Sequence, residues 1–179
     1  MEKNHSPYHI GLRNVKTAFA ATLCALLYYP TGHNPTFACI GAIFGMGSDM
    51  NSSMFSGFTR LFGTIFGGFI GIFLYSIYLL CYPDGSTHFL LFVLLFIGVN
   101  ILIIFGMVFE WPNTIQPGGV VLCIVLLNTE PSTYVTYSAA RIADTAVGVL
   151  VALAINLLLP RERVDKWSKA LHQKFHIKK

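Results

Sequence analysis

Apolar residues in this chain gather into six runs, separated by short segments that are polar or contain proline. A helix that crosses a bilayer without tilting needs roughly 20 residues, and four of the runs come near that length. The other two are shorter. The pattern therefore predicts an all-α integral membrane protein with six transmembrane helices. The runs cover residues 14–29, 37–47, 58–82, 89–109, 118–127 and 139–159.

The two short runs, the second and the fifth, follow Pro35 and Pro117, which we expect to open their helices. Backbone polar groups do not stay unpaired in lipid, so each short run extends into polar turns, is a broken helix, or lines a wet cavity. Short, proline-interrupted segments at matching places in two halves are a pointer to a transporter's binding site. The polar residues beside them are either ligand contacts or ordinary turn residues: Asn34, Thr36, Asn113, Thr114 and Gln116.

Positions in the first half recur in the second half 81 residues later, as Arg60 and Arg141 do. The segment 60–67 resembles the segment 141–148, and the same offset places Asp49 on Glu130. Three crossings in each half would invert the second half relative to the first. We therefore expect two three-helix inverted repeats.

Charge is rare, at 11% of residues against 54% hydrophobic ones, which disfavours a soluble enzyme. The 12 Lys and Arg residues cluster at the two ends, and only Arg60 and Arg141 lie between residues 17 and 160. The net charge of +4 thus indicates basic ends of a membrane domain and no nucleic-acid partner. The positive-inside rule predicts a multi-pass plasma-membrane protein with both termini in the cytoplasm. We divide the chain into a transmembrane domain, 1–160, and a basic amphipathic tail on the inner leaflet, 161–179.

Arg60 and Arg141 are the first candidates for chemistry, because a charge within a membrane segment suggests a functional site. We expect each to lie at the N-terminal end of a long helix, where the helix dipole also favours anions. The planar guanidinium group suits a carboxylate. Two other interpretations stay open: Arg60 marks the cytoplasmic interface, and Arg141 pairs with Asp144 or Glu130.

Asp144 and three glycines mark two helix faces on which small residues recur every four positions. Asp144 shares its face with Gly148, and it either packs there, satisfied by Arg141 or a hydroxyl, or is a carboxylate that couples transport to protons. The helix-packing candidates are Gly63, Gly67, Gly71 and Gly148.

Asp49 and Glu130 are predicted to end the two short helices, which is unfavourable against the helix dipole. Each therefore either forms a salt bridge with the arginine eleven positions later or has a gating role. The histidines lie in tails or loops and no Cys or acid completes a metal set, so we predict no metal and no cofactor. No motif of an enzyme appears.

The chain resembles the membrane domain of the fusaric acid resistance and aromatic acid exporter superfamily, to which the plant aluminium-activated malate channels are distantly related. The motifs that carry the likeness are Pro35-x-Phe37-Ala38-x-Ile40-x-Ala42-Ile43, Arg60-x-x-Gly63-Thr64-x-x-Gly67, Arg141-x-x-Asp144-Thr145-x-x-Gly148 and Asn156-x-x-x-Pro160.

The resemblance implies six membrane helices, a homodimer, and export or conduction of organic anions, often aromatic carboxylates. Many bacterial members carry a large cytoplasmic domain after the membrane part, so we expect a short form that lacks it or borrows it from a separate cytoplasmic partner. The candidate substrate-binding residues are Arg60, Arg141, Thr64 and Thr145, and the candidates for coupling or gating are Asp144, Asp49 and Glu130.

A second hypothesis is a non-transporting scaffold or a subunit of a larger membrane complex. The two hypotheses differ at the arginines. A transporter needs them to face a hydrated cavity, whereas a scaffold would bury them in salt bridges with Asp49 and Glu130.

Overall fold

A computed structural model describes residues 12–159, and these fold into six α-helices joined by short connections. The predicted all-α fold with six helices is confirmed. The helices are α1 (Leu12–Tyr28), α2 (Thr36–Gly45), α3 (Met50–Cys81), α4 (Phe89–Val108), α5 (Ile115–Asn128) and α6 (Tyr134–Leu158), with the 3-10 turns η1 (Tyr29–Thr31) and η2 (Pro112–Thr114). The predicted tail, 161–179, lies outside the described residues.

Three of the described helices, α3, α4 and α6, are long and apolar enough to cross a membrane. Large apolar side chains also cover the outside of the helices: Phe69, Phe96 and Leu150 are 65%, 70% and 64% exposed. Such an outer surface suits hydrocarbon far better than water. The chain is a multi-pass membrane protein.

The helix α3 begins at Met50, about two turns before the apolar run that predicted it. Asp49 makes this early start possible, because its carboxylate accepts hydrogen bonds from the Ser52 amide, at 3.3 Å, and from the Ser52 hydroxyl. Asp49 is therefore the N-cap of α3, and the prediction that it ends the preceding short helix was wrong. At an N-cap the helix dipole favours the carboxylate.

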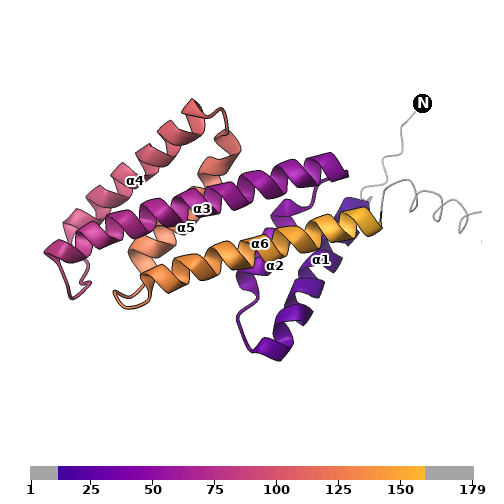
Figure 1. The fold of residues 1–179 in the computed structure, drawn as a ribbon, viewed down its shortest axis with the longest axis horizontal. Coiled ribbons are helices and arrows are strands. Elements are labelled where there is room, and N and C mark those ends of the chain that lie inside the picture. Colours follow the sequence, from indigo (N-terminus) through magenta and orange to yellow (C-terminus); the bar gives the residue numbers. More distant parts are fainter. Residues whose placement is uncertain (1–11, 160–179) are drawn as a thin grey trace, which may run out of the picture.

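The two long helices α3 and α6 pack side by side through the middle of the molecule (Figure 1). Each short helix packs mainly on the long helix of the other half, α5 on α3 and α2 on α6. The outer helices follow the same scheme, since α4 contacts α5 and α3 while α1 contacts α2 and α6. Helices from the two halves are thus interlocked.

Glycines set the distance between the long and the short helices. A Cβ atom on Gly67 in α3 would lie 2.2 Å from the Gly118 carbonyl oxygen in α5. One on Gly148 in α6 would lie 2.1 Å from the Ala38 carbonyl oxygen in α2. Both crossings therefore bring backbone against backbone, which only glycine allows. Gly63 faces the start of α5, where its hypothetical Cβ would lie 2.4 Å from the Thr114 carbonyl oxygen in η2, and Gly71 faces the Val125 side chain in α5 at 3.1 Å.

A buried chain of polar groups ties α1 to α6 and α3. The Lys16 ammonium group donates to the Asn156 side-chain oxygen at 3.0 Å, and the Asn156 amide donates to the Ser53 hydroxyl at 2.9 Å. That hydroxyl accepts the Gly47 amide at 2.7 Å. Lys16 is 3% exposed, so the basic N-terminal segment contributes a charge to the interior as well as to the surface.

Candidate functional site

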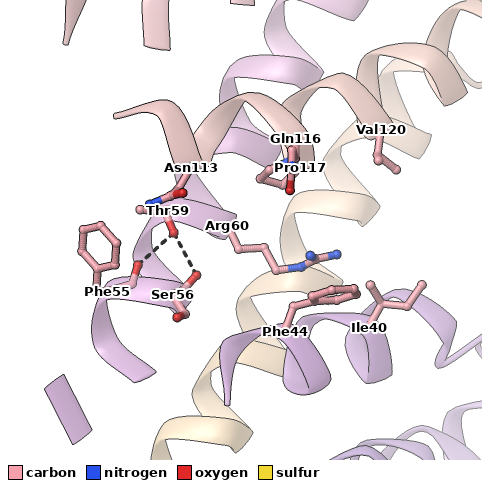
Figure 2. Close-up of a pocket in the computed structure, with 10 residues that line it drawn as sticks. All are labelled: Ile40, Phe44, Phe55, Ser56, Thr59, Arg60, Asn113, Gln116, Pro117 and Val120. Carbon is pink, nitrogen blue, oxygen red and sulfur yellow. Dashed lines mark hydrogen bonds between the residues drawn. The ribbon is translucent and has the colours of Figure 1, made fainter. Parts of the chain in front are cut away.

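An open pocket of about 530 Å³ lies where α2, the first turns of α3, and the start of α5 meet (Figure 2). Its volume falls within the range of small-molecule sites. Half of the ten lining residues are apolar and half are polar or charged. The residues that line it are Ile40, Phe44, Phe55, Ser56, Thr59, Arg60, Asn113, Gln116, Pro117 and Val120.

The Arg60 side chain extends across this pocket toward α2, as Figure 2 shows. Its guanidinium carbon lies 4.7 Å from the centre of the Phe44 ring. No acidic group lies within salt-bridge distance of Arg60 anywhere in residues 12–159. Its Nε atom is buried and has no hydrogen-bond partner there. The pocket therefore contains a cation whose hydrogen-bonding capacity is largely unused.

Both arginines lie farther inside their helices than the sequence predicted. Arg60 is about three turns beyond the start of α3 at Met50, and Arg141 is about two turns beyond the start of α6 at Tyr134. The prediction that each sits at a helix N-terminus was wrong. The helix dipole acts within the first turn, so the guanidinium groups alone supply the positive charge.

The polar residues near the short helices separate into two groups. Asn113 and Gln116 belong to the pocket wall opposite Phe44 (Figure 2). Thr114 instead donates its hydroxyl to the Trp111 carbonyl at 2.7 Å. Asn34 accepts hydrogen bonds from the amide and the hydroxyl of Thr36, as an ordinary turn residue does.

A second, aromatic pocket of about 180 Å³ adjoins the first and shares the walls Phe55 and Thr59 with it. Its other walls are Phe58, Phe62 and Trp111, and the last two rings lie 5.4 Å apart. Its lining is almost entirely apolar. The aromatic pocket is therefore continuous with the wall of the Arg60 pocket that Phe55 and Thr59 form.

Arg141 lies in a closed environment. Its Nη2 atom forms an ion pair with the Asp144 Oδ2 atom at 3.1 Å, and Asp144 also accepts the Tyr28 hydroxyl at 2.8 Å. The guanidinium carbon lies 3.6 Å from the centre of the Phe37 ring and 4.6 Å from that of Tyr137. The open choice between Asp144 and Glu130 as the partner of Arg141 is thereby decided for Asp144.

The other candidate residues lie away from the pocket. Thr64 and Thr145 are buried, 2% and 4% exposed, and the Thr145 hydroxyl donates to the Arg141 carbonyl at 2.8 Å. Neither belongs to the pocket lining. Glu130 is exposed in the turn before α6. In the described part of the chain, neither Asp49 nor Glu130 forms a salt bridge with an arginine, so that interpretation was wrong.

Asp49 is exposed, and hydrogen bonds hold its charge in place. The hydroxyl groups of Ser52 and Ser48 and the Ser52 amide all donate to its carboxylate, so the pKa of Asp49 lies below its ordinary value. Hydrogen bonds to the charged form of an acid favour that form. Asp49 therefore stays ionised as a helix cap.

Two aromatic residues of the Arg60 pocket were not predicted as site residues. The Phe44 ring lies against the Arg60 guanidinium group, and Phe55 lines both pockets. Both lie in apolar surroundings in the sequence, where a phenylalanine is an ordinary membrane residue. Only the packing of α2 against α3 brings Phe44 to Arg60.

Residues 8–159 match the family described as aromatic acid exporter family member 1. The chain belongs to the aromatic acid exporter family. The resemblance identified from the two arginine motifs is confirmed, and the matched segment contains both arginines. Membership in this exporter family implies a membrane transport protein and not an enzyme. Comparisons with curated proteins and with solved structures give no match.

Proposed function

We propose that this protein exports or conducts organic anions, above all aromatic carboxylates, along a path that begins at Arg60. One observation carries the proposal: Arg60 faces an open pocket, and no acid in the described residues neutralises it. A charge in a membrane segment is costly unless it is paired. The partner that Arg60 lacks within the chain is, in this proposal, the transported anion.

The chemistry of the pocket favours a carboxylate that carries a ring. The guanidinium group offers parallel N–H donors that match two carboxylate oxygens. Phe44 lies against Arg60, and Phe55 leads to the aromatic pocket beside it. An aromatic acid would therefore place its charge at Arg60 and its ring against apolar walls, while Asn113 and Gln116 remain available for polar substituents.

For the membrane arrangement we propose six crossings in two inverted three-helix repeats. The packing partners support this arrangement, because each helix of one half contacts the long helix of the other half. The helices α4 and α5 of the second half pack on α3, and the matching helices α1 and α2 of the first half pack on α6. With the N-terminus in the cytoplasm, α3 starts on the cytoplasmic side. The end of α2, the start of α3 and the start of α5 then place the Arg60 pocket in the cytoplasmic half, where an exported anion would enter.

The test is flux of labelled 4-hydroxybenzoate in proteoliposomes that contain the full chain. We expect saturable flux with the wild type. We expect a loss of about 10- to 100-fold with Arg60→Gln, since hydrogen bonds to a charged group contribute about 1.5–3 kcal/mol. Arg60→Lys should retain part of the flux, because it keeps the positive charge but lacks the parallel N–H donors of the guanidinium group.

Two controls make the test specific. Arg13→Gln removes an exposed arginine outside the pocket, whose Nε donates to the Met46 carbonyl at 3.2 Å, and should leave the flux unchanged. Neutral 4-hydroxybenzamide should not compete with the acid. Undiminished flux in a folded Arg60→Gln protein would overturn the role of Arg60. The absence of flux with several organic anions would instead favour the scaffold or subunit hypothesis.

A further inference from the structure

We propose that Arg141 forms a second carboxylate-binding site, which Asp144 occupies in this structure as a tethered competitor of the substrate. The inference rests on the proposed function, because it assigns the same class of anion to a second position.

The surroundings of Arg141 have the features of a site for a flat anion. The guanidinium group lies near the Phe37 ring, at 3.6 Å, and the Tyr137 ring, at 4.6 Å. Contacts with ring faces leave the edge of the guanidinium free to donate hydrogen bonds in its own plane. One acid, Asp144, reaches that edge.

Asp144 uses this edge incompletely. It lies three residues after Arg141 on the same helix, and the ion pair joins one of its oxygens to Nη2 at 3.1 Å. The Arg141 Nε atom stays buried without a hydrogen-bond partner in the described residues. A buried donor without a partner is unfavourable, because it has lost its hydrogen bonds to water. The internal ion pair therefore leaves part of the binding capacity of Arg141 unused.

A free carboxylate can do what the tethered one does not. Bound side-on, its two oxygens would accept from Nη2 and Nε together, which is the bidentate geometry that arginine prefers. Asp144, once displaced, would keep the Tyr28 hydroxyl, which donates to its Oδ1 atom at 2.8 Å. The exchange thus satisfies Nε and leaves Asp144 with a hydrogen bond.

The first half of the chain lacks such a competitor. The residue three positions after Arg60 is Gly63, where the second half has Asp144. Arg60 therefore faces an open pocket, while Arg141 faces its own acid. One anion class would serve both sites, and a single acidic side chain decides which site is open.

Equilibrium binding of labelled benzoate to the full chain in nanodiscs tests this inference. We expect one site in the wild type, which is lost in Arg60→Gln. We expect two sites in Asp144→Asn, the second with a Kd within about tenfold of the first, since each relies on one guanidinium. Arg141→Gln added to Asp144→Asn should remove that second site. Asp49→Asn, a neutralised acid that touches no arginine, should keep one site.

The outcomes separate this inference from the proposed function. No binding to the wild type would contradict the proposed function itself. One site in both the wild type and a folded Asp144→Asn protein would overturn only the tethered competitor. If Asp144→Asn does not fold, the binding of Arg60→Gln at high benzoate concentration tests the second site instead. Arg60→Gln should then show weak saturable binding that disappears in Arg60→Gln/Arg141→Gln, and equal binding by these two variants would refute the second site.

Discussion

The two arginine regions share a framework but differ in electrostatic state. Each arginine lies seven residues, about two helical turns, before a glycine at which a long helix touches the backbone of a short one, Gly67 after Arg60 and Gly148 after Arg141. Yet Arg60 faces an open pocket without an acid, whereas Arg141 is held by Asp144 and two rings. The framework fixes where the cations lie, and one additional carboxylate determines whether a cation is available.

This difference gives the two regions different expected roles. An unpaired guanidinium in a pocket is suited to bind a mobile anion, and an ion-paired one is suited to hold helices together until something displaces its partner. Tyr28 in α1 takes part only in the second arrangement, where it links α1 to α6 through Asp144. The closed region is thus also a tie between helices of the two halves.

The largest effect should come from the shared helix crossings. Gly67→Val and Gly148→Val each add a Cβ that would lie only 2.1–2.2 Å from a backbone carbonyl oxygen, so each should destabilise the fold by about 3 kcal/mol. Thermal unfolding and the yield of monodisperse protein measure this effect. Gly119→Ala is the matched control, because its Cβ would meet nothing within 4 Å, and should be neutral or slightly stabilising. Tolerance at one crossing alone would show that the two crossings are not equivalent.

A smaller loss of stability is expected from the buried polar groups in which the two halves differ. Asn156→Ala removes the acceptor of Lys16 and the donor to Ser53, which should cost about 1–3 kcal/mol of unfolding free energy. The residue 81 positions earlier is Tyr75, whose hydroxyl donates to the Thr129 carbonyl at 3.1 Å instead. The hydrogen bonds of Asn156 therefore have no counterpart at the position that the offset of 81 assigns to it.

Chemical unfolding of Asn100→Ala provides the comparison for Asn156→Ala. The Asn100 amide donates to the Phe96 carbonyl, at 2.8 Å, one turn earlier in its own helix, and its loss should cost a few tenths of a kcal/mol. Equal stability losses in the two variants would contradict a special role of the buried network.

The sequence predicted what depends on local pattern. Six apolar runs became six helices, since hydrophobic length and proline boundaries are written in neighbouring residues. The fourth run, for example, matches α4, Phe89–Val108, almost end to end. The start of α3 was predicted too late because Asn51, Ser52 and Ser53 resemble a polar linker. Asp49 as N-cap turns them into the first turn of a helix.

The site could be predicted only in part, because it depends on contacts between distant segments. Arg60 and Arg141 stand out as rare charges in an apolar chain. Their partners do not, since Asp144, three residues away, and Glu130, eleven residues away, were both candidates for Arg141. The burial of Lys16 was likewise hidden, because it rests on Asn156, 140 residues away.

The aromatic rings that contact the two arginines, Phe44 at Arg60 and Phe37 at Arg141, offer a further way to distinguish the two regions. Phe44→Leu should weaken benzoate binding about two- to fivefold, because an exposed cation–π contact contributes about 0.5–1 kcal/mol, and should hardly affect stability. Phe37→Leu should leave the benzoate Kd unchanged and lower the unfolding free energy by about 0.5–2 kcal/mol. Titration and thermal unfolding of both proteins measure this. If Phe37→Leu weakened binding and Phe44→Leu lowered stability, the binding site would lie at Arg141 and the structural contact at Arg60.

The smallest effect concerns the acids that precede the two long helices. Asp49 caps α3 through Ser52, whereas Glu130 makes no side-chain hydrogen bond or ion pair in the described residues. Asp49→Ala should therefore lower the melting temperature slightly at neutral pH, and Glu130→Ala should not. The pKa of Asp49 is lower in the folded protein than its ordinary value of 3.8, because the folded state favours the carboxylate. Its stabilisation is thus fully present above about pH 4 and is lost as the pH falls through the folded pKa. Melting curves of Asp49→Ala and the wild type should differ at neutral pH and converge in strong acid; a difference that grows in acid would mean that the protonated form of Asp49 is the one that stabilises α3.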